Sequence, residues 1–147
     1  MSGGRKSLKL QIEAMSVAWP TFRVGKRDRV NRSAVWSGVL KPQFTAYRIE
    51  VRYAVGKSPK VRVLSPQLER LPGNEEGSLP HVYGPSSDPT LCLYDPAADE
   101  WNSTMLIAEM IIPWTIDWLT FYEFWLMTGV WSGGGRHPTP LIEETSA

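Results

Sequence analysis

The chain has 147 residues, of which 42% are hydrophobic and 21% charged, a balance that is ordinary for a folded domain and excludes wholesale disorder. Its single cysteine excludes an internal disulfide and favours a reducing compartment, so we expect a cytoplasmic protein with a free thiol. The formal net charge is only +1, but residues 1–70 hold 15 Lys and Arg against 4 Asp and Glu, whereas residues 71–147 hold 1 against 11. Such halves either attract each other within one fold or present surfaces of one sign to a partner.

The N-terminal segment SLKLQIEAMSVA (residues 7–18) predicts an amphipathic helix. Leu8, Ile12 and Met15 recur at the spacing of one helix face, with polar residues around them. The helix should end at Trp19, because a residue that precedes a proline is disfavoured in the helical conformation.

After this helix, apolar residues alternate with polar ones. The pattern predicts four strands, TFRVGKRDRV (21–30), SAVWSGVL (33–40), TAYRIEVRYAV (45–55) and KVRVLS (60–65). In the third strand, the apolar face consists of Tyr47, Ile49, Val51 and Tyr53. Short turns join the four segments, so they predict an antiparallel meander with one solvated and strongly basic face.

Residues 66–80 are rich in Pro, Gly, Asn and Glu and lack periodicity, so they predict a loop that continues into the segment around the cysteine. Cys92 lies between Leu91 and Leu93, in a short buried strand or tight loop flanked by turn-forming residues. Long irregular segments in small domains are usually functional or mobile. A lone cysteine is more often a small buried hydrophobic residue, so the residue type alone leaves its role open.

Two helices are expected after Trp101. The first covers the nearly apolar residues 103–112, and Pro113 ends it and opens the second, residues 114–128. The second carries an aromatic stripe that we expect in the core, made of Trp114, Trp118, Phe121 and Trp125. A membrane span over residues 104–131 is the competing interpretation, but three acidic residues within it would each cost about 2.5–3.5 kcal/mol near the bilayer centre.

The sequence contains no recognisable motif for metal or phosphate chemistry. Cys92, His81 and His137 are too scattered for a metal site, and the glycine run at 133–135 follows a helix instead of opening one. No metal and no cofactor are therefore expected. The basic sheet could contact phosphates, which leaves a nucleic-acid-binding domain as an alternative, although the sheet's tyrosines share the apolar face with Ile49 and Val51.

Four segments, taken in order, resemble the ubiquitin-conjugating (E2) family. WSGVLKP (36–42) is similar to the family's W-x-G-x-I-x-x-P strand, and residues 47–68 are similar to its third and fourth strands. His81 precedes Cys92 by eleven residues, much as the family's HPN motif precedes its active-site cysteine, and Trp101 follows Cys92 by nine. The resemblance covers about residues 7–128. It implies one α+β, E2-like domain over residues 1–147: an N-terminal helix, a four-stranded antiparallel meander, an active-site loop, C-terminal helices and a Gly- and Pro-rich tail at 129–147.

The chain is also similar to the short bacterial E2-like proteins of antiphage cyclic-oligonucleotide (CBASS) systems. The segments that carry this likeness are LCLYDP (91–96), Glu100-Trp101, PWTIDWL (113–119) and WSGGGRHP (131–138). The likeness implies a transferase whose cysteine forms a thioester with the C-terminus of a cGAS-like nucleotidyltransferase and passes it to an amine, such as an acceptor lysine on a target protein. Neither nucleic acid nor a membrane is then an expected partner.

By this resemblance Cys92 is the nucleophile, His81 shapes its loop and Trp101 supports the loop. The family's HPN asparagine, which helps to stabilise the oxyanion, is absent, because Val82 and Tyr83 follow His81. Either Tyr83, a backbone N–H near Cys92 or another group replaces it, or aminolysis is weak.

Acidic residues surround the cysteine in sequence and should disfavour its thiolate. Among them Asp95 is the residue expected to orient an attacking amine. The remaining alternative is a catalytically inactive E2-like protein-binding module, in which the fold persists and Cys92 is only a core residue.

Overall fold

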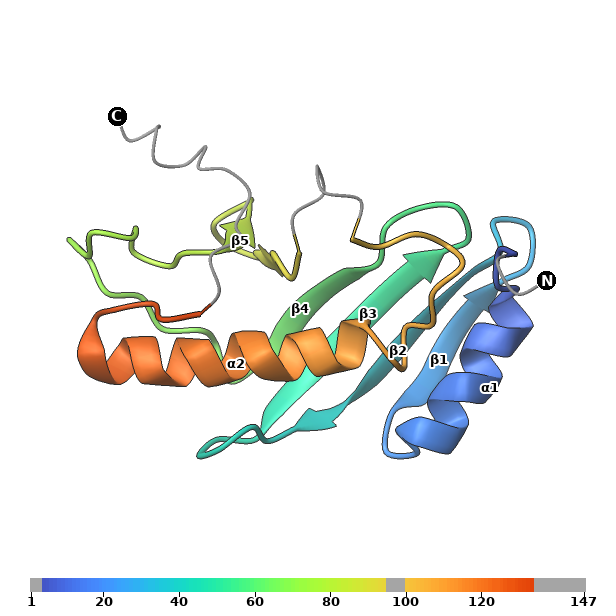
Figure 1. The fold of residues 1–147 in the computed structure, drawn as a ribbon, viewed down its shortest axis with the longest axis horizontal. Coiled ribbons are helices and arrows are strands. Elements are labelled where there is room, and N and C mark those ends of the chain that lie inside the picture. Colours follow the sequence, from blue (N-terminus) through green and yellow to red (C-terminus); the bar gives the residue numbers. More distant parts are fainter. Residues whose placement is uncertain (1–3, 95–99, 134–147) are drawn as a thin grey trace.

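A helix, a four-stranded antiparallel sheet and a second helix follow one another along the chain, which confirms the predicted α+β class (Figure 1). The structure is a computed structural model and describes residues 4–94 and 100–133. Its elements are α1 (Leu8–Ala18), β1 (Arg23–Asp28), β2 (Ser33–Leu40), β3 (Tyr47–Ala54), β4 (Lys60–Ser65), β5 (Val82–Tyr83), β6 (Thr90–Leu91) and α2 (Ile111–Thr128). The main sheet has the order β1-β2-β3-β4, and β5 and β6 form a separate hairpin.

Helix α1 forms where the apolar spacing predicts it. The hydroxyl of Ser7 accepts the N–H of Leu10 at 3.1 Å, which satisfies one of the first amide groups of the helix. At the other end, Trp19 is the C-cap and donates its N–H to the carbonyl of Met15 at 2.8 Å. Gln11 and Met15 are its buried residues.

The inner face of the sheet is the apolar face that alternation predicts. Tyr47, Ile49, Val51 and Tyr53 are all buried, and Trp36 of β2 is buried beside Val51 in the register. Gly38 is required here, because a Cβ at this position would come within 2.5 Å of the Phe22 ring. The glycine therefore lets the segment that follows α1 pack directly on β2.

The predicted separate helix over residues 103–112 is wrong: residues 103–110 form turns and bends, residues 111 and 112 already belong to α2, and α2 is the only helix that the structure describes after Trp101. Side chains of α1 explain the difference. Gln11 donates from Nε2 to the carbonyl of Met105 and accepts the N–H of Ile107 at Oε1, both at 2.9 Å. Trp19 donates its indole N–H to the carbonyl of Ala108 at 2.8 Å. These bonds hold the segment in this path, in which Ile107 and Ala108 are buried.

Helix α2 packs across one face of the sheet (Figure 1). Pro113 lies in its first turn, as predicted, and Trp118 and Trp125 are buried. Trp114 and Phe121 are only partly buried, so the buried face is centred on Leu119 and Tyr122 rather than on the aromatic stripe. No helix in the described part of the chain is long and apolar enough to cross a membrane.

The loop over residues 66–80 is irregular, as predicted, but it is tied to α2 at two points. The N–H of Glu69 donates to the hydroxyl of Tyr122 at 2.6 Å. Asn74 donates from its amide to the carbonyl of Gly129 at 2.7 Å and accepts the indole N–H of Trp125 at 3.2 Å. The loop therefore follows α2 and leads the chain back to β5.

Candidate active site around Cys92

The cysteine lies immediately after the second strand of the β5–β6 hairpin. Val82 pairs with Leu91, and Tyr83 pairs with Thr90. The N–H of Cys92 donates to the carbonyl of His81 at 2.9 Å, which adds one more bond beyond the last pair of the hairpin. The backbone of Cys92 is therefore fixed, although β6, the strand that precedes it, has only two residues.

The thiol of Cys92 is buried, with 7% of the residue exposed. Its Sγ donates towards the carbonyl of Tyr94 at 3.6 Å, the range of a weak sulfur hydrogen bond. Leu91, the preceding residue, is buried as well, with 4% of the residue exposed. The cysteine is thus a buried residue that is largely shielded from solvent.

His81 orders this backbone mainly through its carbonyl. Besides the N–H of Cys92, that carbonyl accepts the indole N–H of Trp118 at 2.9 Å. His81 has a φ of +60°, a left-handed conformation that is uncommon for a residue with a side chain. Its ring stacks on Trp131, with centroids 4.6 Å apart and planes 28° apart. Trp118 and Trp131 therefore both position His81, and the carbonyl of His81 in turn positions the backbone of Cys92.

Trp131 follows α2 and packs back onto it. Its ring lies 5.2 Å from that of Trp118 and 6.2 Å from that of Trp125, between centroids. Gly133 lies close to the ring of Phe121, so that a Cβ there would clash with it. The segment after the helix is therefore folded over the α2 tryptophans and reaches the start of the cysteine hairpin. Neither the Trp118–His81 bond nor this stacking could be read from local sequence.

Trp101, the expected loop support, is buried and packs edge-on against Tyr53 of β3, with centroids 6.1 Å apart. It ties the chain after the cysteine segment to the inner face of the sheet. Asp95, expected to orient an amine, lies outside the residues that the structure describes, as does His137.

Tyr83 is 40% exposed and lines a pocket of about 480 Å³ beside the hairpin. The pocket also contacts the β3–β4 turn, and its other lining residues include Pro59, Lys60, Leu93 and Tyr94. The N–H of Cys92 is already bonded to His81, so this amide is not available to an oxyanion in the geometry observed. Of the replacements considered for the asparagine, Tyr83 is the one with an exposed side chain on the hairpin.

Two arginines bind the turn of the hairpin, one from the sheet and one from the loop over residues 66–80. Arg62 of β4 donates to Asp88 at 2.5 Å, and Arg70 donates to the carbonyl of Ser86. A second hollow of about 330 Å³ lies here and shares Lys60, Gly84 and Thr90 with the first. Among the described residues, no group of three or more His, Cys, Asp or Glu side chains could hold a metal ion.

A family model described as "Type II CBASS E2 protein" matches residues 11–138, a range that includes most of α1, the sheet, the cysteine hairpin and α2. No curated protein matches the chain.

Proposed function

The chain belongs to the E2 proteins of type II CBASS antiphage systems, and from that premise we propose that Cys92 is an acyl carrier in antiphage defence. Its sulfur attacks the activated C-terminal carbonyl of a cGAS-like nucleotidyltransferase. The thiol loses its proton, the C–S bond forms, and the bond from the carbonyl carbon to the activating group breaks, so that this group leaves with its electron pair as a phosphate monoester or as another thiolate. An amine then attacks the thioester, the C–N bond forms, the nitrogen loses a proton, and Cys92 leaves as thiolate.

One observation carries the proposal. The only cysteine of the chain sits at the exit of a hairpin, where the His81 carbonyl fixes its N–H, and its two sequence neighbours, Leu91 and Leu93, line a pocket of about 480 Å³. Reaction at Sγ requires more exposure than 7%, so binding of the acyl donor has to open access to the sulfur.

The oxyanion of each tetrahedral intermediate needs a donor other than the N–H of Cys92. We assign this role to the hydroxyl of Tyr83, a residue of the same hairpin that is 40% exposed and lines the pocket beside it. Asp95 remains the residue that we propose for orienting the amine. His81 and Trp101 are supporting residues in this scheme.

Substitution of the nucleophile tests the proposal. Cys92→Ser should trap the partner as an oxygen ester, which resists DTT but is cleaved by hydroxide, whereas the native thioester is cleaved by DTT. Cys92→Ala should abolish adduct and transfer with little change in melting temperature. The measurement is non-reducing electrophoresis of the cGAS-like enzyme co-expressed with each variant.

An inactive binding module makes the opposite prediction. In that case Cys92→Ala leaves conjugation and signalling by the partner unchanged. Unaltered conjugation with the alanine variant would therefore overturn the carrier function.

A further inference from the structure

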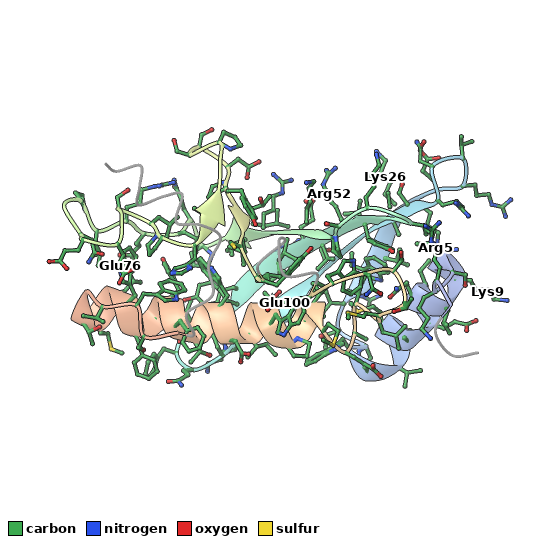
Figure 2. The ribbon with its side chains drawn as sticks, turned by 45° about the horizontal axis from the view of Figure 1, so that its top comes forward. Arg5, Lys9, Lys26, Arg52, Glu76 and Glu100 are labelled. Atoms are coloured by element: carbon green, nitrogen blue, oxygen red, sulfur yellow. The ribbon has the colours of Figure 1, made fainter. Side chains whose placement is uncertain are left out.

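Cations are aligned across the open face of the sheet, on the side away from α2. The register places one row across all four strands, Lys26–Val35–Arg52–Lys60, and beside it a second, Arg23–Ser37–Glu50–Arg62. Arg48 lies in the next row, opposite Val39. Figure 2 shows Lys26 and Arg52 pointing away from the helix on this face. We call the six cations Arg23, Lys26, Arg48, Arg52, Lys60 and Arg62 the basic face.

Only part of this charge is balanced within the chain. Glu50 accepts from Nε of Arg52 at 2.9 Å and from Nε of Arg62 at 2.8 Å, and Asp88 pairs with Arg62. The remaining four cations form no ion pair with any residue in the described part of the chain; they are Arg23, Lys26, Arg48 and Lys60. Within the part of the chain that the structure describes, the basic face therefore keeps a net positive charge.

The basic face also continues into the candidate active site. Lys60, at the end of the first row, lines both hollows beside the hairpin of Cys92. Arg62, at the end of the second row, binds Asp88 in the turn of that hairpin. A macromolecule seated on the sheet would therefore also contact the hairpin.

From these observations we propose that the basic face docks an acidic surface of the protein whose C-terminus is carried by Cys92. This inference rests on the proposed acyl-carrier function and adds the surface chemistry of the partner. Docking brings the donor's C-terminal segment to the hairpin before any covalent bond forms, and so raises its effective concentration at the sulfur. Charge complementarity of this kind mainly accelerates association.

The composition of the face favours a protein over a nucleic acid. Between the cations lie the small uncharged residues Val35, Ser37 and Val39, and Val39 is 48% exposed. Single-stranded nucleic acids are usually held on aromatic side chains, but Tyr47 and Tyr53 of β3 are buried on the opposite face. The basic face thus combines charge with apolar contact area, and its register rows contain no aromatic residue on which a base could stack.

Charge reversal tests this docking apart from the chemistry. In a Cys92→Ala background, which forms no thioester, Lys26→Glu with Arg48→Glu should slow association with the cGAS-like enzyme of the same system about tenfold at low salt, with a smaller difference at high salt. The control is Lys9→Glu with Arg29→Glu, which changes net charge equally but lies on α1 and after β1. Surface plasmon resonance gives the rates, and neutral Lys26→Gln with Arg48→Gln should show a smaller change in the same direction.

Three outcomes would overturn the docking: equal association rates for the reversed, control and parent proteins, a loss that is the same at all salt concentrations, or displacement of the enzyme by duplex DNA or single-stranded RNA. Failure of the carrier function looks different. In that case the protein with Cys92 intact forms no DTT-sensitive adduct, whatever the charge variants do to binding.

Discussion

Trp118 donates its indole N–H to the main-chain carbonyl of His81 across 2.9 Å, and that carbonyl also accepts the N–H of Cys92. A carbonyl oxygen has two lone pairs, so a single atom joins the helix to the cysteine hairpin. The position of the Cys92 backbone is therefore set by α2, through a residue that lies eleven positions before the cysteine.

Trp118→Phe isolates this bond, because phenylalanine retains most of the packing but lacks the indole N–H. We expect a loss of about 1 kcal/mol in unfolding free energy, and slower thioester formation because the hairpin is less well fixed. Trp125→Phe is the matched control, since its indole binds Asn74 instead of His81. The measurements are urea denaturation and the rate of thioester formation. If both variants formed the thioester equally fast, the Trp118–His81 bond would have no part in positioning Cys92.

Gln11→Ala should destabilise the fold by releasing the segment around Ile107, which is far from Gln11 along the chain. The substitution leaves the carbonyl of Met105 and the N–H of Ile107 buried without a partner, which should cost about 2–4 kcal/mol. Denaturant unfolding measures the loss, and hydrogen exchange should show the Ile107 amide becoming less protected. Lys9→Ala, on the exposed side of the same helix, should change stability by less than about 0.5 kcal/mol. Unchanged protection of Ile107 in Gln11→Ala would show that other contacts hold the segment.

Glu123 of α2 is buried and accepts three hydrogen bonds, two from the β2–β3 connection and one from the first residue of β3. The donors are the N–H of Phe44 at 3.2 Å, the N–H of Thr45 at 3.0 Å and the hydroxyl of Tyr47 at 3.0 Å. Glu123→Gln turns an NH₂ group towards these donors and should lower the unfolding free energy by about 1–3 kcal/mol. Burial and, second, the carboxylate raise the pKa of Tyr47, so the same variant should lower that pKa in an NMR titration. An unaltered tyrosine titration would contradict this assignment.

Glu50 should contribute stability that depends on pH. Burial acts to raise its pKa, but hydrogen bonds from Arg62 and Arg52 outweigh burial and hold the pKa below the ordinary value. The contribution is therefore complete above the unfolded-state pKa of about 4.3, and is lost as the pH falls through the lower folded-state value. Because Arg52 is mostly exposed, we expect only about 1 kcal/mol. Glu50→Gln should unfold more easily than the native chain at neutral pH and match it in acid, as measured by urea denaturation.

The elements that sequence predicted correctly are those whose cause is local. The Ser7 cap and the apolar spacing define α1, and strict alternation defines β3 with Tyr47 and Val51 facing inwards. The prediction of a separate helix over residues 103–112 failed for the opposite reason. Their apolar character is explained by burial, but their backbone is held by Gln11 and Trp19, whose distance along the chain makes the interaction invisible to any local pattern.

The candidate site likewise has features that are visible in the sequence and features that depend on contacts between distant residues. Cys92 is marked by being the only cysteine and by its distance from His81, both of which are visible in the sequence. The part of His81 that matters most for the backbone is its carbonyl, and no sequence pattern specifies which side chain a carbonyl meets. Trp118 was expected only as a core residue, and the stacking of Trp131 on His81 depends on the chain folding back after α2.

The bond between Gln11 and Ile107 joins residues 96 positions apart, and this separation governs when the site can form during translation. Helix α1 leaves the ribosome first, the cysteine follows, and Ile107 and Trp118 emerge only later. Contacts of such long range form after the local ones, and a nascent chain cannot make them before both partners have been synthesised. Ribosome-bound chains that end before Ile107 therefore carry a complete Cys92 hairpin sequence but lack the Gln11–Ile107 bond and the Trp118–His81 bond that joins α2 to the hairpin.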